Sequence, residues 1–512
     1  MDCGEGSKLV TRLVLGKDLS PDTDYVTLSH CWGHGLPVLL LKNNLASMLE
    51  EIRFDMLPKT FQDAIIVTRN LRKRYIWIDC LCIIQDDDNM DDWHKEAKTM
   101  TSVYSMSCCN ISATAAVDSS HGLFRDRKPI PQDKVRVKVK MGNDVGWFHF
   151  IANDVWRREI DESPLNRRAW VCQERFLSPC NLHFGRTQLF WECRRFSANE
   201  IYDGGFYDNE YQCQFPDSNK KKVIDNALRS HIDSNDPSEG AKSSYEAWYQ
   251  LVANYTTRKL SFERDKLVAI SGLAAQFGAF NQDQYLAGLW RSHLTSEIIW
   301  KCTDPEEARV NSTYTAPSWS WAATDGPVIM RQLRTDSKLE CVVDILDVET
   351  KLATDDPFGS VKGGVLKLKG PLAVGRYWRA TCRDEKSDGM AICTSVDTYK
   401  PKLGVEWDVP ETEILEEVTE RVDNVDKFID LFVLIVGHYN VHPSNPLFRN
   451  GLVLKQTEKP GVFKRLGSFS QDGTPVKDLT FAIEYFNSIA NQSRLEHEED
   501  GEGGMKYTMT IL

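Results

Sequence analysis

The sequence lacks any long hydrophobic run. Its longest apolar stretch, residues 429–437, is far shorter than the ~18 residues that a membrane-crossing helix needs, and it is typical of a buried strand. The first twelve residues, MDCGEGSKLVTR, contain no apolar segment of the kind found in secretory signals. These absences predict a soluble cytoplasmic protein without a membrane span, in which the fourteen cysteines are thiols rather than disulfides.

Positive charge is not in excess either. The 512 residues include 62 Lys and Arg against 74 Asp and Glu, a net charge of −12. This balance opposes a general role in coating nucleic acid, so no nucleic-acid partner is expected. Hydrophobic residues make up 41% and charged residues 27%, which favours folded domains over disorder. The length suggests about two to four domains.

Several common motifs are missing. No pair of cysteines has the C-x2-C spacing of zinc sites, no G-x-x-x-x-G-K-[ST] phosphate-binding loop occurs, and no internal repeat is found. Cys80 and Cys82 would lie on the same side of an extended strand and would serve a metal in principle. We favour the alternative that they are small buried apolar residues, and we expect no metal.

Residues 8–195 alternate strand-like and helix-like segments, the pattern of an α/β domain with a mainly parallel sheet. Strands are expected at 25–31, 75–81 and 110–115. The intervening helices are expected to begin at Pro58 and at Asp91.

Three further segments complete this first block. KVRVKVK at 134–140 alternates strictly, which predicts a strand with one wet face: either a solvated edge strand, which we favour, or a phosphate-binding stripe. A helix is expected over 165–177, followed by strands at 181–184 and 188–192.

The rest of the chain divides by composition. Residues 196–244 end in a polar, charged stretch that indicates a linker or surface insertion. Residues 245–330 carry apolar stripes at helical spacing, including 285–300, and contain the PSWSWA segment, where Trp319 and Trp321 favour packing over ligand stacking. Residues 331–512 are rich in strand and turn patterns, which predicts a β-rich module.

The segment KRYIWIDCLCIIQD at 73–86 is the most informative one for function. An apolar run ends in a cluster of polar residues, and open α/β sheets bind ligands at the carboxyl ends of their strands. The candidate site residues here are Asp79, Cys82, Gln85 and Asp86.

Three blocks together resemble the fungal heterokaryon-incompatibility (HET) domain family. They are YVTLSHCWG at 25–33, LPKTFQDAIIVTRNLRKRYIWIDCLCIIQDDDNMDDWHKEAKTMTSVY at 57–104, and LNRRAWVCQERFLSPCNLHFGRTQLFWEC at 165–193. The sequence departs from the usual family pattern at Cys80, where Ala is common, and at Ile84, where Asn is common. The resemblance implies a cytoplasmic fungal protein of non-self recognition that triggers cell death. It also implies either a homo-oligomer or a partner incompatibility protein.

HET domains have been likened to TIR domains, which have a Rossmann or flavodoxin-like fold and in some cases cleave NAD. Catalytic TIR domains carry a W-C-x-x-E helix, and here Trp170 and Glu174 keep the separation of Trp and Glu, which is about one helical turn. The resemblance implies that Glu174 is catalytic in an NAD glycohydrolase, with NAD as substrate and no bound cofactor. A carboxylate suits that reaction because a glycosidic bond breaks through an oxocarbenium-like state.

The other candidate residues are placed around the same crevice. His30, Trp32 and Gly33 would form the loop after the first strand, and Asp79, Gln85 and Asp86 would line the crevice. Arg168 or Arg175 would meet a diphosphate. Glu96 would be either a solvated helix residue or a buried partner of His30 or Arg72, and we favour a place at the site. Alternatives stay open. Trp170 is a core residue in one of them, with Glu174 paired to Arg168 or Arg175 on the helix surface. In another, Cys82 and His30 form a nucleophilic pair. In a third, the domain is a non-enzymatic module that self-associates or binds a partner.

Overall fold

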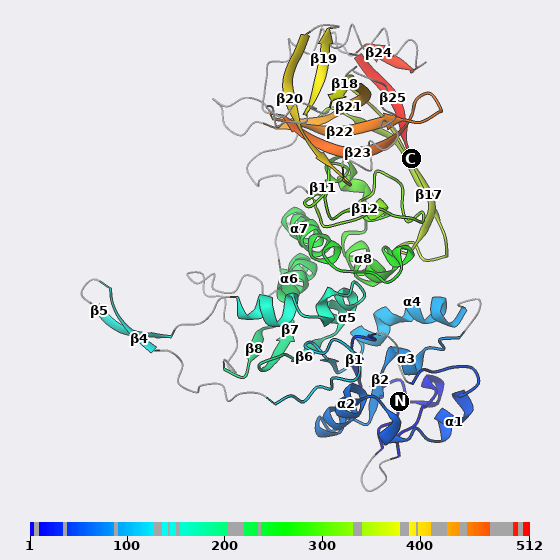
Figure 1. Cartoon of the computed structure of the whole chain (residues 1–512), viewed down its shortest axis with the longest axis vertical. Coiled ribbons are helices and arrows are strands. Elements are labelled where there is room, and N and C mark those ends of the chain that lie inside the picture. The colour runs from blue at the N-terminus through cyan, green and yellow to red at the C-terminus, as the bar shows by residue number, and fades with distance from the viewer. Residues whose placement is uncertain are drawn as a thin grey trace, which may run out of the picture. The chain divides into compact units, whose positions relative to one another are not determined.

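A computed structural model describes most of the chain. The residues described are 1–4, 10–33, 38–86, 91–126, 136–141, 144–149, 154–201, 220–233, 237–330, 340–378, 389–395, 398–410, 428–439, 448–471, 495–499 and 505–512. The chain divides into two compact units, residues 1–244 and 245–512. Figure 1 labels their elements, and each unit is described by itself.

Unit 1 is built on a six-stranded sheet of order β2-β1-β3-β6-β7-β8. Its strands are β1 Tyr25–Ser29, β2 Tyr75–Trp77, β3 Cys109–Ser112, β6 Cys180–Phe184, β7 Leu189–Cys193 and β8 Ser197–Asn199. The first four run parallel, since β1 pairs in parallel with both β2 and β3, and β3 pairs in parallel with β6. β7 and β8 are added antiparallel. The expected mixed α/β architecture with a mainly parallel sheet is therefore confirmed.

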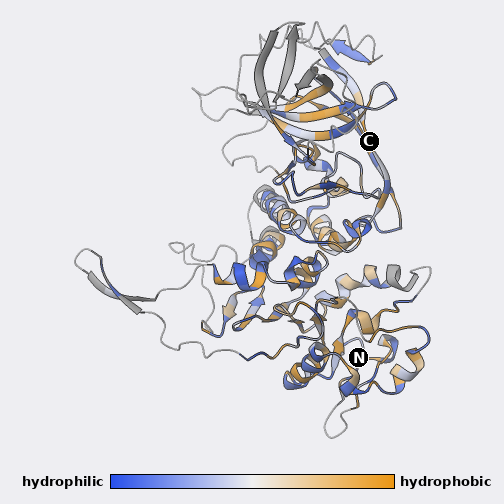
Figure 2. Ribbon diagram, viewed as in Figure 1, coloured by the Kyte–Doolittle hydropathy of each residue, from blue (hydrophilic) through white to orange (hydrophobic). Residues whose placement is uncertain are grey.

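Helices connect the parallel strands, as the alternation predicts. α1 Leu45–Glu50 and α2 Lys59–Asn70 lie between β1 and β2, and α4 Asp91–Ser105 precedes β3. α2 begins directly after Pro58, and its apolar side chains at helical spacing, including Phe61 and Ile65, are fully buried. In Figure 2 the ribbon of α2 carries both hydrophobic and hydrophilic colours, as expected for a helix with one buried face and one exposed face. The buried face joins Val26, Ile76 and Ile111 of the strands in one core.

Two predicted elements differ from the structure. The strand expected over 75–81 stops at Trp77, and Asp79–Cys82 forms the short helix α3. Cys80 and Cys82 therefore do not share one side of a strand. The helix expected over 165–177 is divided into a 3-10 turn, η4 Leu165–Arg167, and α5 Val171–Leu177. In both places the apolar pattern identified buried positions correctly but did not distinguish a strand from a helix or one helix from two.

The polar stretch at the end of the 196–244 segment, predicted as a linker or surface insertion, is helical where it is described. α6 Lys220–Asp233 and the start of α7 Pro237–Thr256 cover it. Lys221 of α6 is 2% exposed and donates to the backbone oxygen of Arg175 at 2.6 Å. Composition suggested solvent here because lysine is seldom buried, but a satisfied ammonium group allows it. Residues 202–219 lie outside the described part of the chain.

The alternating segment at 134–140 forms a hairpin apart from the main sheet, as far as it is described. β4 Arg136–Met141 pairs antiparallel with β5 Asp144–His149. Lys138 and Lys140 are exposed, as the expected wet face requires. Residues 134 and 135 lie outside the description.

Unit 2 begins with helices and short hairpins. α7 carries the buried Trp248, Leu251 and Val252, and α8 Val268–Asn281 follows it. The helix expected over 285–300 is wrong: β9 Tyr285–Leu286 and β10 Leu289–Trp290 form a tight hairpin, followed by η6 Arg291–His293 and α9 Leu294–Glu297. Ala287 and Gly288 have positive φ at the turn, which breaks helical continuity.

Trp319 and Trp321 are fully buried within unit 2. The indole of Trp321 donates to the backbone oxygen of Gly288 at 2.9 Å, and the backbone oxygen of Trp319 accepts from Trp300 at 3.0 Å. The favoured interpretation of these two residues as packing residues is consistent with this burial.

The rest of unit 2 is β-rich, as expected. One eleven-stranded sheet contains β15 Glu340–Cys341, β16 Asp344–Leu352, β17 Val361–Gly370, β18 Leu372–Trp378, β19 Gly389–Ser395, β20 Thr398–Trp407, β21 Phe428–Tyr439, β22 Phe448–Gln456, β23 Val462–Gln471, β24 His497–Glu499 and β25 Met505–Ile511. β18, β19, β20, β23, β22 and β21 pair in that order, and β21 pairs again with β18. These strands close on themselves, which leaves none of them with an open edge.

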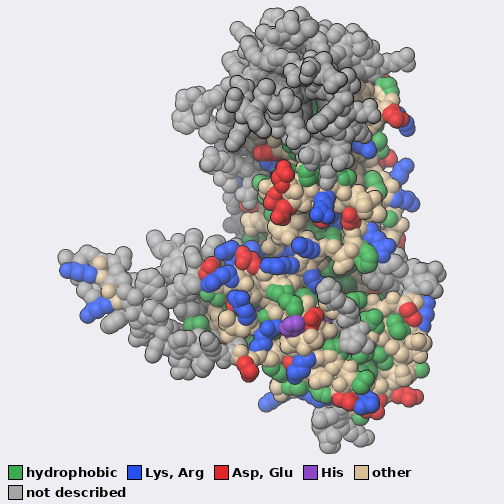
Figure 3. Space-filling model, in the orientation of Figure 1, with side chains coloured by type: hydrophobic (Ala, Val, Ile, Leu, Met, Phe, Trp, Pro, Cys, Tyr) green, Lys and Arg blue, Asp and Glu red, His purple; other side chains and the backbone are tan. Residues whose placement is uncertain are grey.

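The surface is charged with both signs. On the face drawn in Figure 3, basic and acidic side chains of the described residues are interspersed. Among the described helices, none has both the length and the apolar composition needed to cross a membrane.

Candidate functional site

The candidate site lies where the parallel strands of unit 1 end. From β1 the chain crosses to β2 on one side and then to β3 on the other, so β1 and β3 border the point where the strand order reverses. In open α/β sheets this point is where ligands bind. Ser29 ends β1 and His30 follows it, Asp79 follows β2, and Ser112 ends β3.

Glu174 on α5 points into this region rather than to bulk solvent. It is 5% exposed, and the hydroxyl of Ser29 donates to its carboxylate at 2.5 Å. The hydroxyl of Tyr104, from α4, also hydrogen-bonds to it. Burial raises the pKa of Glu174 to about 7, and the carboxylate of Asp79 adds to the rise; Arg168, Ser29 and Tyr104 oppose it. The alternative of a surface ion pair for Glu174 is therefore wrong.

Four more residues complete the cluster around Glu174: His30, Asp79, Trp32 and Arg168. The Trp32 indole donates to Asp79 Oδ2 at 2.9 Å, and His30 Nδ1 lies 3.7 Å from Asp79 Oδ1. Arg168 donates to the backbone oxygen of His30. Burial lowers the pKa of His30 to about 4, against the opposing effect of the Asp79 carboxylate, so its ring is neutral at pH 7.

A buried chain of hydrogen bonds connects this cluster with the far strands of the sheet. Asn110 of β3 donates to the hydroxyl oxygen of Ser29 at 3.0 Å and to Asn181 of β6 at 3.1 Å. Asn181 donates to Glu192 of β7 at 3.3 Å, and Glu192 accepts two bonds from Arg175 at 2.8 Å. Because each of these groups is nearly fully buried, the network fixes the relative positions of β1, β3, β6 and α5.

Gly33, in the loop after β1, has a backbone conformation that favours glycine. Its φ is +72°, and a Cβ at this position would lie 2.4 Å from the Cβ of Asp118. We expect Gly33→Ala to destabilise unit 1 by about 2 kcal/mol, because alanine is strained at positive φ and Asp118 would have to shift. Thermal unfolding of the full chain measures this, and Gly16→Ala, at a position with open space, is the control. Equal stability of the two variants would contradict it.

Three predicted residues do not join the cluster. The carboxylate of Asp86 accepts from the backbone nitrogen of Lys42 at 2.8 Å, and the Gln85 side chain donates to the backbone oxygen of Ile83 at 2.9 Å. Asp86 thus holds the loop that follows Leu40, and the Gln85 side chain bonds within its own segment. Arg175 is 1% exposed and bound by Glu192 and Asp161, so it is not available for a diphosphate. Arg168 is half-buried and keeps that expected place.

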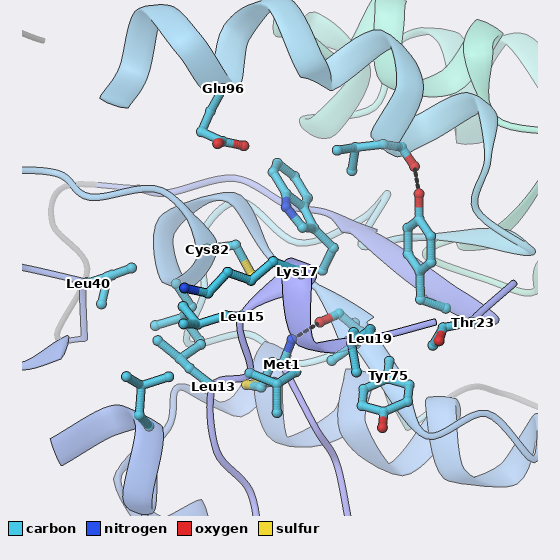
Figure 4. A pocket seen from close by; sticks show the side chains of 18 of the residues that line it. Met1, Leu13, Leu15, Lys17, Leu19, Thr23, Leu40, Tyr75, Cys82 and Glu96 are labelled. Atoms are coloured by element: carbon cyan, nitrogen blue, oxygen red, sulfur yellow. Dashed lines mark hydrogen bonds between the residues drawn. The ribbon is translucent and has the colours of Figure 1, made fainter. Parts of the chain in front are cut away.

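Cys82 and Glu96 belong to a different pocket. Both line a cavity of about 950 Å³ in unit 1, which Figure 4 shows from close by. The Glu96 carboxylate accepts from the hydroxyl of Thr99 at 3.1 Å. The described contacts of Cys82 include none with His30, so the structure gives no support to a nucleophilic pair.

Trp170 is the N-cap residue of α5, and its backbone oxygen accepts from the backbone nitrogen of Glu174 at 3.3 Å. The two residues therefore sit one helical turn apart, as their spacing predicts. Trp170 is half-buried.

One group of described residues has metal-ligand atoms close together. The ligand atoms of His30, Asp79 and Cys80 lie within 4.8 Å of one another, and nitrogen, oxygen and sulfur donors of this kind bind zinc. Burial raises the pKa of the Cys80 thiol well above its usual range, which opposes the thiolate that a metal requires.

Sequence reasoning missed Ser29 and Tyr104, the two hydroxyl donors to Glu174. Ser29 stands beside His30 in the YVTLSHCWG block, and Tyr104 falls on the buried stripe of α4. The pattern placed Tyr104 inside correctly, but its hydroxyl has a partner only because α4 packs against α5.

The arrangement supports proton transfer and the stabilisation of positive charge. A carboxyl group with a pKa of about 7 exists in both protonation states near neutral pH. Arg168 supplies a cation beside it, and Trp32 and Asp79 form the partly exposed outer part of the cluster.

The comparison with protein families matches the part of unit 1 that contains this site. Residues 25–174 match the family described as heterokaryon incompatibility protein (HET). The match begins at the first residue of β1 and ends at Glu174, so it contains the whole cluster. Comparison with curated proteins and with solved structures finds no match. The chain thus carries a heterokaryon-incompatibility (HET) domain over residues 25–174.

Proposed function

We propose that the HET domain is a TIR-like effector of heterokaryon incompatibility that triggers cell death by cleaving NAD. The observation that carries this proposal is the state of Glu174. A carboxyl group with a pKa of about 7 lies at the carboxyl ends of parallel strands, beside an arginine and two hydroxyl groups. Perturbed carboxyls in such places are typical of catalytic sites. The order of the four parallel strands, with β1 between β2 and β3, also suits a flavodoxin-like fold.

Three residues of the cluster have a defined part in the proposed reaction. The bond between ribose and nicotinamide breaks, and nicotinamide leaves with the bonding electrons. The ionised Glu174 stabilises the positive charge that develops on the ribose. Water then adds to the ribose carbon and gives its proton to the carboxylate. Arg168 is suited to the diphosphate, and the Trp32 ring offers a face for a flat base.

Access to Glu174 requires a movement of side chains. With 5% of the residue exposed, the carboxylate meets a substrate only after neighbouring groups shift. Asp79, whose side chain is 22% exposed, and the half-buried Trp32 and Arg168 form the outer part of the path. Substrate-induced opening of this kind is common where a site has to exclude water.

A second candidate function is a non-enzymatic module that self-associates or binds a partner protein. The same burial of Glu174 favours it, because the Ser29 and Tyr104 hydroxyls already satisfy the carboxylate as they would in a structural network. In that case the cluster serves only the fold.

A direct assay of the full chain separates the two functions. The purified protein is incubated with NAD, and free nicotinamide is quantified by chromatography. NADH is the control substrate, because its reduced nicotinamide ring lacks the positive charge that makes nicotinamide a good leaving group. The proposal expects release from NAD alone. No release from a folded sample, in both the monomeric and the assembled state, would contradict it and favour the binding module.

A further inference from the structure

Unit 1 contains a cavity that the proposed NAD chemistry does not use. It has a volume of about 950 Å³, within the range of small-molecule sites. Its lining comes from two parts of the chain: Met1 and residues 13–25, nearly all upstream of the HET match, and elements of the HET domain itself from Leu40 to Val103. Figure 4 shows Glu96 approaching from α4, with Met1, Leu13 and Tyr75 on the other side.

The lining is largely aliphatic and incompletely covered. Leu13, Leu15 and Leu19 face Leu45 and Leu49 of α1 and the buried Leu81 of α3. Leu15 is 38% exposed, and Leu19, Leu45 and Leu49 are half-buried. Each of these side chains would lose further contact with water if the cavity were filled by an apolar group, at roughly 25 cal/mol per Å².

Most polar groups around the cavity are already paired. The Tyr25 hydroxyl donates to the backbone oxygen of Val103 at 2.7 Å, and the amino terminus of Met1 donates to the backbone oxygen of Ile76 at 2.8 Å. Glu96 accepts from Thr99. Lys17, in contrast, has no ion-pair partner within the part of the chain that the structure describes, and its exposed side chain lies beside Leu15 at the cavity (Figure 4).

From this combination we propose that the cavity binds a single-chain amphipath with a carboxylate head, that is, a medium- or long-chain fatty acid. The aliphatic chain occupies the leucine-lined interior, and the carboxylate pairs with Lys17 at the rim. A cationic amphipath fits less well, because the acidic group at the cavity, Glu96, is already engaged by Thr99.

One aromatic contact links the lining of the cavity to the cluster around Glu174. Trp77 lines the cavity and packs edge-on against Tyr104, with ring centroids 5.7 Å apart. Tyr104 in turn hydrogen-bonds to Glu174. Binding itself does not depend on the NAD proposal, so it is measured directly, without NAD.

Calorimetric titration of the full chain tests the inference with dodecanoate, dodecanol and dodecylamine, each below its aggregation concentration. The wild type is expected to bind one dodecanoate and to prefer it to dodecylamine. Lys17→Glu should weaken dodecanoate binding about fivefold and leave dodecanol binding unchanged, since an exposed ion pair has a modest effect. Lys242→Glu, at an exposed lysine of α7, is the matched control and should bind like the wild type.

A second variant tests the location. Leu49→Trp replaces the half-buried leucine side chain of α1 with a bulkier indole that fills part of the cavity. It is expected to reduce binding of both dodecanoate and dodecanol at least tenfold. The inference is overturned if the wild type shows no saturable binding, if dodecylamine binds as tightly as dodecanoate, or if Leu49→Trp, shown to be folded by circular dichroism, binds like the wild type.

Discussion

The Glu174→Gln variant is expected to lose nicotinamide release by about 100-fold or more and to become more stable relative to the wild type as the pH rises. Glutamine keeps the shape of the side chain and its hydrogen bonds with Ser29 and Tyr104, but it carries no charge. The variant therefore removes the group that would stabilise the oxocarbenium-like state while leaving the packing of α5 intact.

The pH dependence follows from the raised pKa of Glu174. A carboxyl group with a pKa of about 7 in the folded state and an ordinary value of 4.5 binds its proton more tightly when folded. Its contribution to stability is complete below pH 4.5 and is lost as the pH rises to 7. The loss is on the order of 3 kcal/mol, and glutamine does not titrate.

Pulse proteolysis in urea between pH 5 and 8 measures this difference on the full chain, since the protease digests only unfolded protein. The matched control is Glu162→Gln, whose carboxylate is 48% exposed and paired with Arg157. If the stability of the wild type and that of Glu174→Gln change equally with pH, Glu174 titrates near its ordinary value. Unchanged nicotinamide release in the variant would remove Glu174 from the reaction.

The Arg175→Met variant is expected to lower the stability of unit 1 by about 3 to 5 kcal/mol. Arg175 donates two bonds to Glu192 and one to Asp161, each at 2.8 Å. Glu192 is fully buried, and Arg175 holds the pKa of its carboxyl well below the usual range. Methionine fills a similar volume but leaves the fully buried Glu192 without its main partner, whereas Asp161 keeps Lys220 at 3.1 Å. The uncompensated charge of Glu192 is the source of the loss.

Arg157→Met is the control for this prediction. Arg157 and Glu162 form an ion pair with both side chains about half exposed, and its loss should change stability by less than about 1 kcal/mol. Urea unfolding of the full chain, followed by hydrogen exchange of the peptides that contain β6 and β7, compares the two variants. A loss below 1 kcal/mol in Arg175→Met would mean that solvent reaches the buried carboxylates.

The sequence predicted the sheet of unit 1 better than its connections. Tyr25 and Tyr75 begin two strands at their predicted starts, and Cys109 begins the third one residue before its predicted start. Apolar runs bounded by polar turns identify buried parallel strands. The same signal failed at Asp79–Cys82, where buried residues form a helical turn instead of a strand. Burial is visible in the pattern, but over four or five residues a strand and a helix bury similar residues.

The candidate site was also predicted only in part. Residues that flank the ends of β1 and β2, such as His30, Trp32 and Asp79, come together as expected because parallel strands end at one edge of the sheet. Gln85 and Asp86 were assigned to the same edge, yet α3 turns the chain away before it reaches them. Arg175 is next to Glu174 in sequence, but adjacent helical positions point in different directions, and it pairs with β7 instead.

The sequence alone determined the family, the alternation of strands and helices in residues 25–174, and the choice of Glu174 as the residue to test. These depend on local patterns and motif identity. Only the tertiary structure decided that Glu174 is buried against Ser29 and Tyr104, that Lys221 is an interior residue, and that an aliphatic cavity lies beneath residues 13–25. Such features arise from contacts between segments distant in sequence, and the desolvation that raises the pKa of Glu174 exists only once those segments have packed together.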